Sequence, residues 1–323
     1  MLVLGNNYVV SSGRCLLTKM LSIFNYFKRP EYIFRPRQVL NRVRRIGKDI
    51  PSTARVDLPW GATIDVRPND NVGSDIFYFG IFDRIVPEAI YRLADADELL
   101  VEAGANIGQN SSLMAYKAGA NGRVIAFEPH PEIFTELKSN ANLWPEKIQA
   151  NVQLENIALG DITGEAWLTD GSYFGYNRGT ASLLNRDVGP EPSRRHKVLV
   201  RRLDEYLPAP MKVGVCKIDV EGHELAVLKG AEHALSRGAI RDIVFEDFSP
   251  EPSPVVDFLR KHGFTVFQLT ASWWKPLLTE LLPGITPPPG FSHNYLATTD
   301  PQRAQSRFRS GGWRCLMFRP RSA

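Results

Sequence analysis

The chain has few cysteines and no long apolar run. Its three cysteines, Cys15, Cys216 and Cys315, are odd in number and far apart, which argues against a disulfide framework and against a cysteine-based zinc site. No stretch reaches the roughly 18 consecutive apolar residues of a membrane span, and the N-terminus lacks the order of regions that marks a signal peptide. These absences favour a cytoplasmic protein in a reducing compartment.

Charge is distributed unevenly along the chain. Residues 1–50 hold ten lysines and arginines against two acids, and residues 301–323 hold six arginines and no acid, yet the whole chain has a net charge of only +4. The middle is therefore acidic. Basic ends can contact an anionic surface such as nucleic acid, or they can be solubilising tails. The second interpretation is preferred, because no aromatic residues are interleaved with the basic ones, and nucleic acid is not an expected partner.

Strand and helix patterns alternate from residue 98 onward, which predicts an α/β domain with a largely parallel sheet. The expected strands span 98–103, 123–127, 150–157, 213–219, 240–246, 264–269 and 293–298, and the expected helices 107–118, 131–143, 223–235 and 254–261. Residues 53–67 alternate around a Pro/Gly turn and predict a hairpin. The chain thus divides into a basic helical extension (1–50), a hairpin and helical cap (51–97), a core domain (98–300) and an arginine-rich tail (301–323).

The segment Leu99 to Pro129 has the pattern strand, glycine turn, helix, strand, acid. Gly104 allows a sharp turn after the first strand, and Gly108 allows the next helix to approach a ligand or the sheet closely. Glu128 ends the second strand, twenty residues after Gly108, where a carboxylate can accept hydrogen bonds from both hydroxyls of a ribose. The pattern predicts a nucleoside-containing cofactor, although a glycine turn alone also occurs in ordinary α/β proteins.

The spacing of the glycines indicates which cofactor. Dinucleotide sites use G-x-G-x-x-G to admit a pyrophosphate, whereas this turn is G-x-x-x-G with Asn106 in the middle. Glu102, just before the turn, would repel a pyrophosphate but tolerate a cation. S-adenosylmethionine carries a sulfonium and an ammonium group, so the sequence favours it over NAD. An NAD-dependent oxidoreductase stays the alternative.

A second group of polar residues follows the strand predicted at 213–219. Asp219 and Glu221 are separated by one residue, so on an extended segment they point the same way, toward the edge that holds the glycine turn. Asp219, Glu221 or His223 could accept a proton from an acceptor hydroxyl. The acids could instead hold a divalent cation, or begin the next helix, so no metal ligand is predicted.

Seven segments, taken in order, resemble the FkbM-type S-adenosylmethionine-dependent methyltransferases. They are VEAGANIG (101–108), GRVIAFEPHPEIFTELKSNANLW (122–144), ENIALGDITGEAWL (155–168), GTASLL (179–184), VLVRRLDEYL (198–207), VCKIDVEGHELAVLKGA (215–231) and IVFEDF (243–248). The ordered set is far more specific than any one segment. It covers just over half the chain and leaves both basic ends unexplained.

The resemblance implies a Rossmann-like class I methyltransferase fold: a mostly parallel seven-stranded sheet with helices on both faces and a final antiparallel strand. It also implies methyl transfer, usually to a hydroxyl of a sugar or other small metabolite. By position, the methionine end of the cofactor would be lined by Glu102, Gly104, Asn106 and Gly108, and the ribose would be bound by Glu128. The adenine would lie by Asn156 and Ala158, and the transferred methyl group near Asp219 and Glu221.

A non-catalytic, cofactor-binding scaffold of the same fold is an alternative of a different class. The sequence specifies neither the acceptor, whether small molecule or glycan, nor the oligomeric state.

Overall fold

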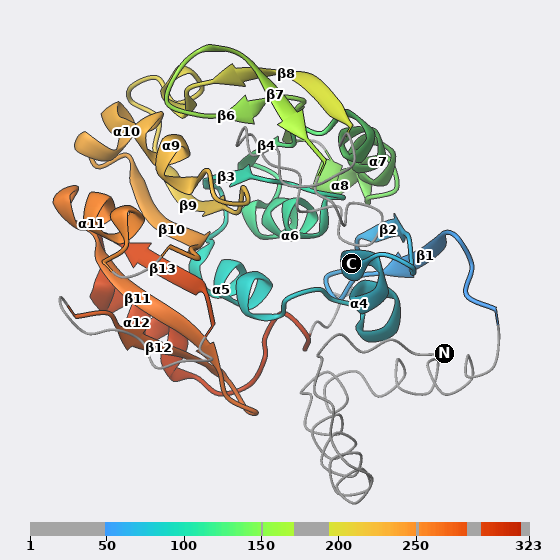
Figure 1. The fold of residues 1–323 in the computed structure, drawn as a ribbon. Coiled ribbons are helices and arrows are strands. Elements are labelled where there is room, and N and C mark those ends of the chain that lie inside the picture. The colour runs from blue at the N-terminus through green and yellow to red at the C-terminus, as the bar shows by residue number, and fades with distance from the viewer. Residues whose placement is uncertain (1–48, 150, 171–193, 250–251, 283–291, 318–323) are drawn as a thin grey trace, which may run out of the picture.

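The computed structural model describes residues 49–149, 151–170, 194–249, 252–282 and 292–317 (Figure 1). The helical extension predicted over 1–50 thus lies almost wholly outside the described residues, as does the end of the tail, 318–323. The predicted hairpin is confirmed as β1 (Ala54–Asp57) and β2 (Thr63–Val66). In the part of the chain that is described, every helix is too short or too polar to cross a bilayer.

An eight-stranded sheet with the order β12-β11-β13-β10-β9-β3-β4-β5 forms the centre of the molecule (Figure 1). Its strands are β3 (Leu99–Ala103), β4 (Arg123–Phe127), β5 (Val152–Glu155), β9 (Val213–Ile218), β10 (Ile240–Glu246), β11 (Thr265–Ala271), β12 (Pro276–Glu280) and β13 (Asn294–Thr298). The strands from β5 to β10 pair in parallel, and β13 lies antiparallel between β10 and β11. The α/β class and the final antiparallel strand are confirmed.

The sheet has eight strands rather than the expected seven, because β12 adds to its edge. β12 pairs antiparallel with β11. It begins with Pro276, which an edge strand tolerates at its first residue, and most of its side chains are at least partly exposed. A short strand with so little buried apolar surface has no periodic pattern by which the sequence would reveal it.

Helices cover both faces of the sheet, as expected. Successive residues of each central strand alternate between two apolar clusters: Leu100 and Val215 belong to one, Val101 and Cys216 to the other. The first cluster lies under α5 (Ile85–Leu93), α6 (Gln109–Ala118), α7 (Pro131–Ala141) and α12 (Pro301–Arg309). The second lies under α9 (Glu224–Lys229), α10 (Glu232–Ser236) and α11 (Pro254–Lys261).

The prediction of a single helix over 223–235 is wrong, because this segment forms two helices, α9 and α10. Gly230 lies so close to another segment that an added Cβ would be 2.0 Å from the carbonyl oxygen of Gly160. The carboxylate of Asp204 then caps the new helix, accepting hydrogen bonds from the amides of His233 (3.1 Å) and Ala234 (2.9 Å). A contact between distant segments sets this break.

Smaller elements surround the main sheet. A three-stranded sheet with the order β6-β8-β7 covers one end of it (Figure 1). The strands of this small sheet are β6 (Ala158–Leu159), β7 (Gly164–Thr169) and β8 (Arg195–Arg201). The remaining short elements are the helices α4 (Asn71–Phe79) and α8 (Glu146–Gln149) and the 3₁₀ helix η2 (Leu203–Glu205).

The described part of the arginine-rich C-terminal segment packs against the core. α12 buries Ala304 and Phe308, and Trp313 is wholly buried. Arg303 forms ion pairs with Asp95 (2.6 Å) and Asp242 (3.0 Å). The division into domains remains a prediction, but residues 301–317 do not form the solvated tail that their charge suggested.

Candidate active site

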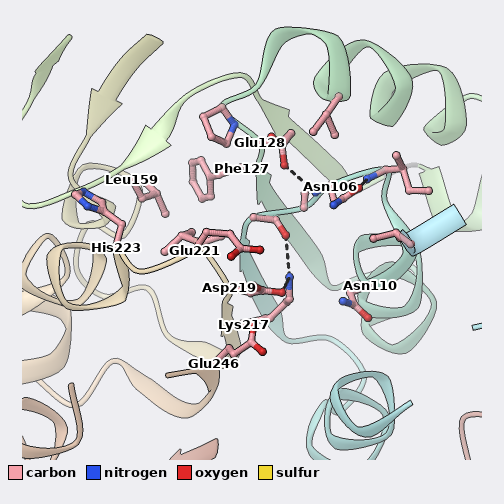
Figure 2. Close-up of a pocket in the computed structure, with 18 of the residues that line it drawn as sticks. Asn106, Asn110, Phe127, Glu128, Leu159, Lys217, Asp219, Glu221, His223 and Glu246 are labelled. Carbon is pink, nitrogen blue, oxygen red and sulfur yellow. Dashed lines mark hydrogen bonds and ion pairs between the residues drawn. The ribbon is translucent and has the colours of Figure 1, made fainter. Parts of the chain in front are cut away.

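A cavity of about 390 Å³ opens at the carboxyl ends of β3, β4, β9 and β10 (Figure 2). Its wall includes residues 103–107, 127–129 and 157–159, together with Lys217, Asp219 to Glu221, and Glu246. The chain reverses its direction across the sheet between β3 and β9, and open α/β sheets bind their ligands at such a point. The predicted glycine turn and the predicted acidic group therefore meet at one cavity.

The turn after β3 requires a glycine at position 104. Gly104 has a φ of 81°, and a Cβ there would lie 1.9 Å from the carbonyl oxygen of Asp219. The amide of Asp219 also donates to the carbonyl oxygen of Ala103 at 3.1 Å. The ends of β3 and β9 are thus joined backbone to backbone at the floor of the cavity.

Glu128 lies in the cavity wall, and both of its carboxylate oxygens accept hydrogen bonds from the protein backbone. They accept hydrogen bonds from the backbone amides of Asn106 and His130, each at 2.9 Å. Burial raises the pKa of Glu128 to about 7, against these two hydrogen bonds, which lower it. Each oxygen retains a second lone pair, so the carboxylate can still accept hydrogen bonds from a ligand.

Three predicted cofactor residues lie outside the cavity wall. Gly108, with a φ of 95°, packs against Leu137 and Trp144 rather than a ligand: a Cβ there would lie 2.7 Å from Leu137 Cδ1. The side chain of Asn156 donates to the carbonyl oxygen of Glu128 at 2.8 Å. Glu102 is fully buried beneath the glycine turn. These residues hold the wall in place, whereas Gly104, Asn106, Glu128 and Ala158 belong to it.

Lys217 connects the two halves of the site. Its Nζ donates to the carbonyl oxygen of Gly104 (2.8 Å) and forms ion pairs with Glu102 (3.2 Å) and Asp219 (3.3 Å). Burial by itself lowers the pKa of Lys217, but the two carboxylates outweigh it and raise the pKa well above the usual range. The lysine therefore stays charged, and Ser111 holds the other oxygen of Glu102 by a hydrogen bond.

Carboxyl groups gather around Lys217 at one end of the cavity. Burial and the charge of Asp219 raise the pKa of Glu221 to about 7 and that of Glu246 to about 8. Burial also raises the pKa of Asp83, which hydrogen-bonds Asn294. Glu221 has a φ of 53°, an uncommon conformation for a residue other than glycine.

The third predicted catalytic residue, His223, lines the cavity but lies apart from this group of carboxyl groups. Its Nε2 is 3.3 Å from where a Cβ of Gly160 would be, and Figure 2 shows it on the side of Leu159, away from the group formed by Lys217, Asp219 and Glu246. Burial lowers the pKa of His223.

Sequence reasoning missed Asp83 and Glu246. Glu246 could have been found, because it ends a strand predicted to reach the same sheet edge. Asp83 follows α4 in an irregular segment, and only the fold brings it to the cavity.

This sheet order, with the cavity at the switch point, defines a Rossmann-like class I methyltransferase fold. The family model described as the methyltransferase FkbM domain matches residues 102–266, and the chain belongs to that family.

Two curated relatives share part of this sequence. The hexuronic acid methyltransferase AglP of Haloferax volcanii is 35% identical over 143 residues, which are 44% of this chain and 53% of that protein. The 31-O-demethyl-FK506 methyltransferase FkbM of Streptomyces tacrolimicus is 31% identical over 247 residues, 68% of this chain and 90% of that protein. This chain thus spans about half the length of AglP.

A crystal structure of an O-methyltransferase from Thermotoga maritima matches at 11% identity and a TM-score of 0.38, over 77% of this chain and 86% of that one. The family assignment rests on the sequence match and the sheet order.

We predict that Gly104→Ala destabilises the protein more than a matched glycine substitution does. Gly263 has nearly the same φ, 83° against 81°, but nothing lies within 4 Å of a Cβ there, so Gly263→Ala carries only the backbone strain, about 1–2 kcal/mol. Gly104→Ala adds the collision with Asp219, roughly another 1–3 kcal/mol. Urea unfolding of both variants measures the difference, and equal losses would show that the two strand ends are not in close contact.

Proposed function

We propose that this protein is an S-adenosylmethionine-dependent methyltransferase that methylates a hydroxyl oxygen of a sugar or another small metabolite. The observation that carries the proposal is the arrangement of carboxylates: Glu128 stands at one end of the cavity and the Asp219–Glu221 pair at the other, with the glycine turn between them. A nucleoside and a cationic sulfonium need these groups at opposite ends. The name of one relative, a 31-O-demethyl-FK506 methyltransferase, supports an oxygen as the acceptor atom, and the name of the other, a hexuronic acid methyltransferase, supports a sugar as the acceptor molecule.

In this proposal each predicted cofactor residue has a part that fits its position. Glu128 accepts hydrogen bonds from the ribose hydroxyls, and Ala158 lies against the adenine. Gly104 and Asn106 form the turn that passes the methionine end. The other three residues support the cofactor site without lining it. Glu102 forms an ion pair with Lys217, and Gly108 lets α6 pack closely. Asn156 holds the backbone carbonyl of Glu128 by a hydrogen bond.

The chemical step is an in-line displacement. The acceptor oxygen attacks the methyl carbon, the carbon–sulfur bond breaks, and its electron pair stays on sulfur to give S-adenosylhomocysteine. The acceptor proton passes to a carboxylate, for which we propose Asp219 with Glu221, since His223 lies toward Leu159. Orientation of the two reactants supplies most of the acceleration. A divalent cation held by the same acids is the alternative way to activate the hydroxyl.

Calorimetric titration tests the cofactor directly. We expect one S-adenosylmethionine or S-adenosylhomocysteine to bind per chain and NAD to give no measurable heat, because the wall beside the glycine turn carries the acids Asp219 and Glu221, which would repel a pyrophosphate. Binding of NAD without S-adenosylmethionine would support the oxidoreductase instead.

The variant Asp219→Asn distinguishes a catalytic methyltransferase from a protein of the same fold that only binds the cofactor. We expect methyl transfer to fall at least about 100-fold while the affinity for S-adenosylhomocysteine changes little, because the variant keeps the size of the side chain but not its basicity. Asp257→Asn, on the exposed face of α11, is the control and should keep full activity. Unchanged transfer by Asp219→Asn would remove this residue from the mechanism, and repeating the assay with EDTA tests the cation route.

Binding of adenosine should depend on pH through Glu128. Adenosine has the ribose but no charged group, so it isolates this end of the cavity. With a pKa of about 7, Glu128 is ionised above neutral pH and can accept from both hydroxyls. The affinity should therefore rise as the pH passes through about 7 and level off above it. Glu128→Gln should bind weakly at every pH, and a pH-independent wild type would contradict the role.

The acceptor end of the cavity should disfavour anionic acceptors. Among the described residues of its wall, Asp83, Asp219, Glu221 and Glu246 surround one lysine, and that lysine is engaged by Glu102 and Asp219. A carboxylate on the acceptor would face this charge. We expect kcat/KM for a neutral hexoside to exceed that for the matching hexuronide by about tenfold or more, which corresponds to roughly 1.4 kcal/mol. A preference for the hexuronide would show that the acids do not face the acceptor.

A further inference from the structure

Three metal-ligating side chains converge beside the nucleoside end of the cavity but outside its wall. His130 follows Glu128 and Pro129, Asp170 follows β7, and His196 lies on β8. One ligand atom from each lies within 4.8 Å of the other two. His130 and Asp170 are buried and His196 is half-buried. The proposed methyl transfer uses none of them.

The polar contacts within this group are incomplete. The Nε2 atoms of both imidazoles lie close to the same oxygen, Asp170 Oδ1, at 3.0 Å from His130 and 3.3 Å from His196. Only His130 makes a hydrogen bond to it, and the Nε2 of His196 is shielded from solvent without one. Buried polar atoms normally have a partner, so two ring nitrogens close to one oxygen, one of them without a hydrogen bond, suggest a ligand between them.

We propose that His130, Asp170 and His196 bind a Zn²⁺ ion, with water at the fourth position. Zinc bonds to nitrogen and oxygen are about 2.0–2.2 Å long, so neighbouring ligands of a tetrahedral ion are about 3.3 Å apart. The two separations from Asp170 match that spacing. Two neutral imidazoles and one carboxylate suit zinc, whereas Mg²⁺ and Ca²⁺ prefer oxygen ligands.

Zinc binding requires a change at His130. Its Nδ1 now accepts weak hydrogen bonds from the amides of Glu132 (3.2 Å) and Ile133 (3.5 Å), which caps α7. With zinc on Nε2 the proton moves to Nδ1 and these bonds are lost. Both lie at or beyond the long end of the normal range, and Pro131 at the start of α7 still favours the helix. A helix cap contributes far less free energy than a structural zinc ion.

The position of the site indicates a structural role. The amide of Asp170 donates to the carbonyl oxygen of Arg194 at 3.0 Å, so the site lies where β7 and β8 meet. The backbone amide of His130 donates to Glu128. An ion here would fasten the small sheet to the loop that carries the proposed ribose carboxylate.

Titration of the full chain, untagged and freed of metal by a chelator, tests the proposal. We expect one Zn²⁺ per chain in a competition assay with a chromophoric chelator, no competition from Mg²⁺ or Ca²⁺, and the absorption bands of a tetrahedral ion when Co²⁺ replaces zinc. His196→Ala and Asp170→Asn should each weaken zinc binding at least about 30-fold. His233→Ala removes an exposed imidazole of α10 and should leave it unchanged.

Absence of one-to-one zinc binding by the wild type, or equal affinity in the His196 and His233 variants, would overturn the site. Titration of each variant with S-adenosylhomocysteine shows whether the fold is intact, and it separates failure of the zinc site from failure of the proposed function. If His196→Ala does not fold, the cobalt spectrum of the wild type still decides.

Discussion

The cavity depends on one buried cation. Lys217 belongs to β9, and the register of the two parallel strands sets it opposite Glu102 of β3. Its ammonium group contacts Glu102 below the sheet edge and Asp219 at the edge. It also donates a hydrogen bond to the carbonyl oxygen of Gly104 in the glycine turn. Its side chain thus joins the two segments that the sequence marks as functional, in addition to the backbone hydrogen bond between Asp219 and Ala103. The lysine therefore fixes how the turn after β3 lies against the loop after β9.

The acidity of the site follows from this arrangement. A single lysine pairs with both Glu102 and Asp219 and can offset only one of their two charges, so the further acids at that end, Glu221 and Glu246, face an excess of negative charge in a poorly solvated place. Their pKa values rise for that reason as well as through burial. Carboxyl groups that titrate near neutral pH can accept a proton from a hydroxyl. The same excess of charge suits a cationic sulfonium and disfavours anionic ligands. The electrostatics thus connect fold, cofactor and acceptor.

Much of the fold was predictable because it is local. The central strands β3, β4 and β9 are largely apolar runs followed by polar residues, and this pattern reveals them. β12 and the break between α9 and α10 were not predictable, since one depends on edge pairing and the other on the approach of Gly160 to Gly230.

The site shows the same division between local and long-range features. Gly104, Glu128 and Asp219 follow strands and were assigned to the cavity from the sequence alone. Glu102 was expected to face the ligand, but strand register turns it toward Lys217. Asp83 and the His130–Asp170–His196 group are assembled from segments with no pattern in common, so no spacing rule finds them.

A double-mutant cycle between Lys217 and Glu102 tests the central claim most directly. Urea unfolding would be measured for Lys217→Met, Glu102→Met and the double variant. Lys217→Met alone leaves a buried carboxylate without its partner and should cost about 3–5 kcal/mol. The account predicts that the double variant is more stable than Lys217→Met, because the uncompensated charge is gone. Additive losses would contradict it and show that the two charges do not hold the site together.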